Sequence, residues 1–164
     1  MHSISNKSNV LIVYFSCSNR TEKVAQHIQR KTEGLLFKII PQQPYTDKDL
    51  EYYTDNRADK EQADYSCRPA IKNSVVNFEN YDVVFLGYPI WQGQAPKIIF
   101  TFLESYDFSK KIIIPFCTSH SSGIGDSDVN LHAFAKPKKW VKGKRFSSHE
   151  SEKTIFEWIE SLDF

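Results

Sequence analysis

The chain has 164 residues, enough for one domain that buries about 70% of its unfolded surface and needs no metal or disulfide to fold. Hydrophobic residues make up 40% and charged residues 25%, the balance of an ordinary globular protein. The net charge of +1 provides no overall field toward nucleic acid or a membrane surface, so we expect neither as a partner.

The cysteines and the start of the chain bear on its location. Cys17, Cys67 and Cys117 cannot all pair and no Cys-x-x-Cys occurs, which favours a reducing compartment. Residues 1–8 are polar and lack the apolar run of a signal peptide, and no later run is long enough to span a bilayer. We therefore expect a cytoplasmic protein with a polar tail over 1–8 and one domain over 9–164.

The first half of the chain alternates predicted strands and helices. Residues 9–15 and 35–40 are rich in apolar and β-branched residues, which predicts two strands. Between them, 21–31 carries apolar residues at helical spacing, and Gly34 suits its end. The segment 47–64 is charged and largely helical in propensity.

The second half continues the alternation. Residues 82–87 and 111–117 predict two more buried strands, and 95–105 predicts a helix with Pro96 in its first turn. A short helix over 127–134 and a weak fifth strand at 140–141 follow.

The end of the chain predicts one more helix. Ser147-x-x-Glu150 resembles a capping box. It precedes apolar residues spaced as a core-facing helical stripe: Ile155, Trp158, Ile159 and Leu162.

Continuously apolar strands are buried on both faces, which is typical of a parallel sheet between helices. We therefore predict an α/β fold in three layers, a doubly wound sheet of five parallel strands. In such sheets, ligands bind outside the carboxyl ends of the strands at a switch point in strand order. The loops after the first, third and fourth strands are the candidates.

The loop after the first strand consists almost wholly of hydrogen-bonding groups. It reads Ser16, Cys17, Ser18, Asn19, Arg20, Thr21 and leads into a predicted helix. Helix N-termini attract phosphate through unpaired N–H groups and a partial positive charge. Asn19 tolerates the left-handed backbone that a tight anion nest would use. A plain helix cap with polar neighbours explains this loop equally well.

The other two loops also follow buried strands. GYPIWQGQAP, residues 87–96, holds Trp91 on a stiff backbone, where it could cover a planar ring or simply close the sheet end. CTSHSSGIG, residues 117–125, offers small polar groups to the edge of a heterocycle, although a surface turn with His120 as a surface histidine fits too. Together, the loops would supply an anion nest, an aromatic plate and a polar rim, as a phosphorylated flat cofactor requires.

These motifs resemble the flavodoxin-like FMN-binding family, in particular short-chain bacterial flavodoxins. Their phosphate loop, [ST]-x-T-G-N-T, here reads S-C-S-N-R-T, with Asn19 in place of glycine and Arg20 in place of asparagine. Their flavin-stacking loop, commonly Y-P-I-W-W-G, reads Y-P-I-W-Q-G, with Gln92 in place of the second tryptophan. The stretch IIPFCTSHSSGIG resembles the loop that borders the pyrimidine end of the flavin.

The resemblance implies FMN as cofactor and the strand order 2-1-3-4-5. It places the phosphate on the first loop, the isoalloxazine against Trp91 and the pyrimidine edge at the third loop. We assign no catalytic residue and no metal ligand. The implied cofactor-binding residues are Ser16, Cys17, Ser18, Asn19, Arg20, Thr21, Pro89, Ile90, Trp91, Gln92, Gly93, Thr118, Ser119, His120, Ser121 and Gly123.

Within this family two functions stay open: an FMN-dependent oxidoreductase acting on a small acceptor such as a quinone, and a one-electron carrier between proteins. Carrier flavodoxins are strongly acidic, so the near-zero net charge favours the oxidoreductase. The charge is unevenly distributed, with seven acidic residues in 47–64 and six basic residues without an acidic one in 136–145. Both runs read most simply as solvated surface, and the basic run also suits NAD(P)H or an acidic partner.

Two other classes compete with a redox protein. A small cysteine phosphatase also places a Cys loop after its first strand but needs Cys-x5-Arg, and the residue at that position is Lys23. A non-redox binding module that kept the fold and lost the cofactor would account for Asn19 and Arg20.

Overall fold

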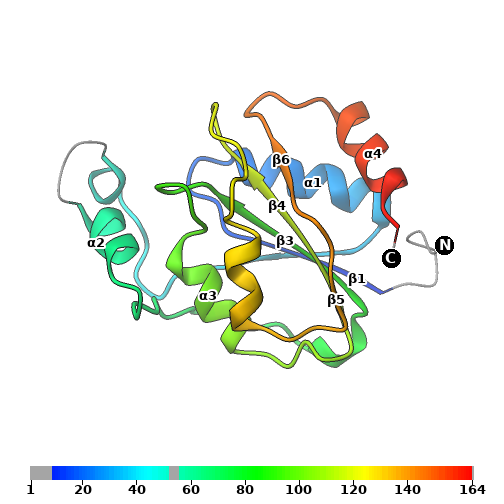
Figure 1. Ribbon diagram of the computed structural model, residues 1–164, viewed down its shortest axis with the longest axis horizontal. Helices are drawn as coiled ribbons and strands as arrows, with labels where there is room; N and C mark the ends of the chain where they lie inside the picture. Colours follow the sequence, from blue (N-terminus) through cyan, green and yellow to red (C-terminus); the bar gives the residue numbers. More distant parts are fainter. Residues whose placement is uncertain (1–8, 52–55, 164) are drawn as a thin grey trace.

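A twisted parallel sheet runs through the middle of the computed structural model, which describes residues 9–51 and 56–163 (Figure 1). The strands follow the order β2-β1-β3-β4-β5, with β6 also paired to β4, and every pairing is parallel. The predicted fold and strand order are therefore confirmed, whereas the predicted tail over 1–8 lies outside the described residues. The strands are β1 Val10–Tyr14, β2 Leu35–Lys38, β3 Val83–Pro89, β4 Ile112–Thr118, β5 Lys139–Trp140 and β6 Lys144–Phe146.

The fifth strand position is divided into two short pieces. Lys139–Trp140 pairs with the start of β4 and Lys144–Phe146 with its end. Between them the Gly143 N–H turns to the Asp128 carboxylate and donates at 2.9 Å. A side chain at Gly143 would place its Cβ 2.6 Å from Cδ1 of Ile124 and 2.9 Å from the Asp128 carboxylate, so a larger residue there would displace these neighbours. The single weak strand predicted at 140–141 is thus one half of an interrupted strand.

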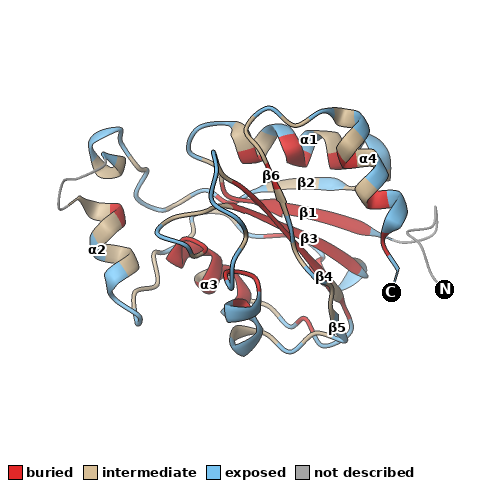
Figure 2. Ribbon diagram, turned by 45° about the horizontal axis from the view of Figure 1, so that its top comes forward, coloured by how far each residue is buried: buried red, intermediate tan, exposed pale blue. Residues whose placement is uncertain are grey.

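Helices cover both faces of the sheet (Figure 2). One face packs against α1 and α4, and the other against α3 and the 3-10 segment η3, so successive side chains of each central strand enter opposite cores. A further helix, α2, lies beside the sheet and does not cover a face (Figure 1). The helices are α1 Arg20–Thr32, α2 Arg57–Ala63, α3 Lys97–Glu104 and α4 Glu152–Ser161, with 3-10 segments η1 Lys48–Leu50, η2 Phe78–Asn80 and η3 Val129–Phe134.

Helix boundaries differ from the predictions where a local cap decides them. Ser147 donates from its N–H to the Glu150 carboxylate at 3.2 Å, but this pair precedes the helix. The cap of α4 is Ser151, which accepts from the Thr154 N–H, so the predicted capping box is wrong as a helix cap. Likewise, Pro96 occupies the cap position of α3 rather than its first turn.

The charged segment after β2 is less helical than predicted. It forms one turn of 3-10 helix, η1, and the seven-residue α2, while residues 52–55 of the predicted helix lie outside the described part. None of the helices within residues 9–51 and 56–163 has the length and apolar character needed to cross a bilayer.

Candidate functional site

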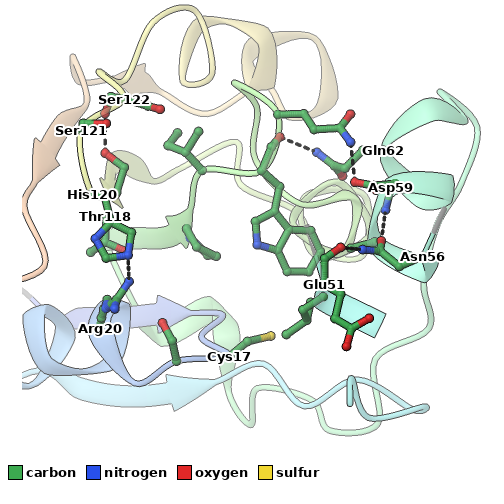
Figure 3. A pocket seen from close by; sticks show the side chains of 18 residues that line it. Cys17, Arg20, Glu51, Asn56, Asp59, Gln62, Thr118, His120, Ser121 and Ser122 are labelled. Atoms are coloured by element: carbon green, nitrogen blue, oxygen red, sulfur yellow. Dashed lines mark hydrogen bonds between the residues drawn. The ribbon is translucent and has the colours of Figure 1, made fainter. Parts of the chain in front are cut away.

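A cavity of about 580 Å³ opens at the carboxyl edge of the sheet (Figure 3). The parallel register brings the ends of β1, β3 and β4 to this edge, where Tyr14 pairs with Gly87 and Pro89 with Thr118. All three predicted loops therefore converge on one hollow, and its size suits a small-molecule ligand. A fourth wall comes from η1 and α2 and contributes Leu50, Glu51, Asn56, Ala58, Asp59 and Gln62.

The first loop ends in the turn that an anion nest requires. Asn19 has φ 66° and ψ 2°, the left-handed conformation predicted for it, and occupies the cap position of α1 without a side-chain capping bond. Ser16 Oγ is the one buried side-chain polar atom of the described residues that has no hydrogen-bond partner. A buried hydroxyl without a partner is costly, so its place beside a helix N-terminus indicates a ligand with acceptor atoms.

Thr21 is buried beside the end of β4. The residue is 1% exposed, and its hydroxyl lies 2.7 Å from that of Thr118, which is 4% exposed. The pair joins the first turn of α1 to the end of β4. Thr21 does not line the cavity.

Cationic groups connect the first loop, the third loop and β6. The guanidinium of Arg20 contacts Nε2 of His120 across the rim (Figure 3). Arg145 donates to the Ser119 hydroxyl at 2.9 Å and to the carbonyls of Ser119 and His120 at 3.0 and 2.9 Å. The third loop is thus held by β6 and is not the free surface turn that the sequence left open.

The second loop is a tight two-residue turn. Trp91 and Gln94 exchange two backbone hydrogen bonds of 2.8 and 3.1 Å, and Gln92 and Gly93 between them have φ 52° and 77°. Positive φ at both central residues defines a type I′ turn, which the sequence supports through Gly93.

The Trp91 indole is fixed by aromatic neighbours on its edges. Its ring centroid lies 5.7 Å from that of Phe15 and 5.4 Å from that of Tyr45, both nearly perpendicular to it. Edge-to-face contacts position an aromatic ring firmly. Trp91 also lines the cavity, so it does more than close the end of the sheet.

Gln62 on α2 fastens the second loop to the fourth wall. Its amide NH₂ donates to the carbonyls of Trp91 and Ala95 at 3.0 and 3.2 Å, and its Oε1 accepts from the Lys97 N–H at 3.1 Å. One side chain therefore holds both ends of the loop and caps the start of α3. Nearby, Gln92 donates to the Asp59 carboxylate at 2.6 Å (Figure 3).

The rest of the fourth wall is held together around Arg57. Its guanidinium lies 3.8 Å above the Tyr45 ring and donates to Glu61 at 3.0 Å and to the carbonyls of Gln43 and Pro44. The Tyr45 hydroxyl donates to Glu61 in turn, and burial, together with this acceptor, raises the pKa of Tyr45. The sequence analysis did not place this wall at the site. Its one local sign was Asn56, whose side chain caps α2 by accepting from Asp59 N–H at 2.8 Å.

Cys17 lines the cavity, and its thiol is free. Desolvation by the surrounding protein raises its pKa to about 11, although the Lys38 and Arg57 charges act in the opposite direction. A cysteine phosphatase needs the reverse, a thiolate at neutral pH. Lys23 also stands where the phosphatase motif requires arginine, so the residues of this loop do not match that class.

Most of the predicted site residues surround the cavity. Eleven line it directly: Cys17, Ser18, Arg20, Pro89, Ile90, Trp91, Gln92, Thr118, Ser119, His120 and Ser121. Ser122, which lies within the predicted third loop, also lines it. Five predicted residues do not line the cavity: Ser16, Asn19, Thr21, Gly93 and Gly123. Of these, Ser16 and Asn19 shape the first loop and Gly93 the turn of the second.

Comparisons with known proteins agree with this architecture. The family model described as Flavodoxin matches residues 9–162, nearly the whole chain. The chain belongs to the flavodoxin family. Crystal structures of two proteins assigned as flavoproteins support the membership. The one from Bacteroides eggerthii DSM 20697 has 37% identity and a TM-score of 0.86, and the match covers 94% of this chain and 97% of that chain. The one from Bacteroides uniformis ATCC 8492 has 33% identity and a TM-score of 0.87, and the match covers 94% of this chain and 99% of that chain.

A more distant structural neighbour was crystallised with FMN bound. The flavoprotein of Lactobacillus acidophilus NCFM, crystallised in complex with FMN, is 23% identical over 84% of this chain and 93% of that chain, with a TM-score of 0.68. At this identity the likeness concerns the fold. No curated protein matches the sequence.

Proposed function

We propose that the cavity binds FMN and that the protein passes electrons through it to a small acceptor or a partner protein in the cytoplasm. The cofactor is FMN, as the family supports. Bound FMN supplies the redox chemistry, and the residues around it bind, orient and shield it. The described cysteines are all free thiols, which suits a reducing compartment.

The observation that carries this proposal is the unpaired hydroxyl of Ser16. Its Oγ is buried in the first loop, three residues before Asn19, the left-handed cap residue of α1. A phosphate at this helix N-terminus would accept from the hydroxyl and from the first N–H groups of α1. Arg20, on the same rim, adds positive charge for a dianion.

The remaining walls suit a flat, polar-edged ring system. Trp91 offers an aromatic face held by Phe15 and Tyr45, and the third loop offers the small polar groups from Thr118 to Ser122. Asp59 and Glu51 line the fourth wall, so negative charge is closer to the site than the three loops alone suggested. Carboxylates in a cavity wall disfavour added negative charge on a ligand, and reduction of the flavin adds such charge.

The proposal is tested by titrating the purified, flavin-free protein with FMN and with riboflavin while following flavin fluorescence. We expect saturable binding of both and tighter binding of FMN, because only FMN carries the phosphate. A protein that binds neither flavin would be the non-redox module that has lost its cofactor. Hydrolysis of a phosphotyrosine mimic that is lost in Cys17→Ser would instead support the phosphatase.

Two measurements then separate an oxidoreductase from a carrier. Steady-state oxidation of NAD(P)H by the FMN-loaded protein, with a quinone as acceptor, would identify an oxidoreductase. Turnover near zero, together with two well-separated one-electron reduction potentials, would identify a carrier. The near-zero net charge leads us to expect turnover.

A further inference from the structure

A run of basic residues follows the edge of the sheet formed by β5 and β6. The segment 136–145 contains six basic residues and no acidic one, and five of the six are exposed. We call this surface the basic edge: Lys136, Lys138, Lys139, Lys142, Lys144 and Arg145.

The strand pairing fixes how the basic edge lies. Lys139 pairs with Ile112 at the start of β4, and Lys144 pairs with Phe116 near its end. With a rise of about 3.3 Å per residue, Lys139 and Lys144 lie roughly 13 Å apart along the strand position. It occupies the outermost position of the sheet, beyond β4 (Figure 1).

The end of the basic edge at Arg145 adjoins the cavity wall. Arg145 pairs with Cys117, one residue before the cavity-lining Thr118, and its guanidinium holds the Ser119 and His120 carbonyls. A protein bound along this edge would therefore lie against the third loop.

The positive charge of the basic edge is not neutralised by the residues around it. Within residues 9–51 and 56–163, none of the six takes part in an ion pair. The neighbouring Asp128 is buried and accepts from the Gly143 backbone. Glu51 and Asp59 of the acidic segment 47–64 line the wall of the cavity that η1 and α2 form, and α2 lies away from β5 and β6 (Figure 1).

We propose that the basic edge is the docking surface for an acidic redox protein, which exchanges electrons with the cofactor at the adjoining cavity. This inference rests on the proposed FMN function. An acidic partner would be drawn to the basic edge and repelled from the acidic segment, which fixes its orientation over the third loop. A nucleotide is a poorer match, because none of the six side chains lines the cavity and their charge is spread along a whole strand.

The first test measures docking without any flavin. Plastocyanin, an acidic blue-copper protein, is added to the isotopically labelled chain at low salt while backbone NMR signals are followed. We expect shifts concentrated in residues 118–122 and 136–146 that disappear at high salt. Shifts centred elsewhere, or no salt-dependent shifts, would overturn the proposal.

The second test measures electron transfer with matched charge variants. The FMN-loaded, reduced protein is mixed with oxidised plastocyanin, and each electron lost by the flavin reduces one Cu(II) to Cu(I). Lys139→Glu/Lys144→Glu should slow the reaction about tenfold or more at low salt, within the range of electrostatic steering. Lys72→Glu/Lys153→Glu, exposed residues outside both the basic edge and the acidic segment, makes the same change in net charge and should slow it about twofold at most.

The outcomes separate the two proposals. If the protein binds no flavin, the proposed function fails, and the NMR titration still decides whether the basic edge docks an acidic protein. If flavin binds but both double variants slow the reaction equally, only net charge matters and the docking surface is refuted. In that case the lysines serve to prevent the exposed sheet edge from pairing with a strand of another molecule.

Discussion

The hydroxyls of Thr21 and Thr118 lie 2.7 Å apart in the interior, where they join the first turn of α1 to the last residue of β4. This bond fixes the first loop relative to the third, and both loops border the cavity. Two residues that lie 97 positions apart in the sequence therefore hold these two loops together.

We expect Thr21→Val or Thr118→Val to lower the free energy of unfolding by about 1–3 kcal/mol, because each leaves the other buried hydroxyl without its partner. The double variant should cost less than the sum of the two, since it leaves no unpaired group. Urea unfolding of the four proteins measures this coupling. Additive losses would mean that the two hydroxyls do not interact.

Ser16→Ala should weaken FMN binding about tenfold to a hundredfold and leave riboflavin binding unchanged, because a hydrogen bond to a charged phosphate contributes about 1.5–3 kcal/mol. The variant should be no less stable than the parent, since it removes a buried hydroxyl that has no partner in the protein. Flavin titrations and thermal unfolding check both parts. Equal losses for FMN and riboflavin would contradict the phosphate assignment.

Trp91→Ala should weaken FMN and riboflavin alike, by about 0.5–1.5 kcal/mol beyond the lost buried area, because both ligands share the ring system. Trp158→Phe is the control, since Trp158 is partly buried and packs against Phe85 and Phe146, away from the cavity lining. The control should retain the parent's affinity for both flavins. Unchanged flavin affinity in Trp91→Ala would remove this residue from the site.

Gln62→Leu should lower the free energy of unfolding by about 1–3 kcal/mol and weaken both flavins, because the Trp91 and Ala95 carbonyls and the Lys97 N–H lose their partner. Gln62→Glu keeps the acceptor for Lys97 but not the donors to the loop, so it should recover part of the stability and little flavin binding. Gln26→Leu, an exposed position on α1, controls for the substitution itself. A loss of stability without a loss of flavin affinity would show that Gln62 does not position the loop.

The Cys17 thiol should react slowly with iodoacetamide near neutral pH. Its pKa of about 11 exceeds the ordinary 9.0, so it holds roughly a hundredfold less thiolate at pH 7.5. A raised thiol pKa also means that its contribution to stability is full below pH 9 and is lost as the pH rises from 9 through 11. Mass spectrometry of alkylated Cys67→Ser measures the reaction at Cys17, since Cys117 is buried. Rapid alkylation at neutral pH would contradict this prediction and support the phosphatase alternative.

The sequence predicted the sheet and three sides of the site because those features are local. Apolar runs identify the central strands, and parallel pairing then brings the loops that follow them together. The same local reasoning identified Asn19 as a left-handed residue. It could not tell that the Thr21 hydroxyl points inward to Thr118 while that of Ser16 is left unpaired, since both read as polar loop residues.

The fourth wall could not be predicted, because nonlocal side-chain contacts attach it. The segment 47–64 reads as a charged, solvated surface, and nothing in its spacing shows that Gln62 reaches the Trp91 carbonyl or that Arg57 covers Tyr45. The break in the fifth strand was not predicted from the sequence for a similar reason. It depends on the contact between Gly143 and Asp128, which lie 15 residues apart.

The way α2 is attached has a consequence for how this scaffold can diversify. The helix stands beside the sheet and reaches the cavity through individual side chains such as Gln62 and Asp59, so no strand depends on it. Substitutions or changes of length there can reshape the mouth of the cavity while the strand order and the first loop persist. We expect relatives to vary most in this segment, and exchanging it between them should be a direct way to alter which molecules gain access.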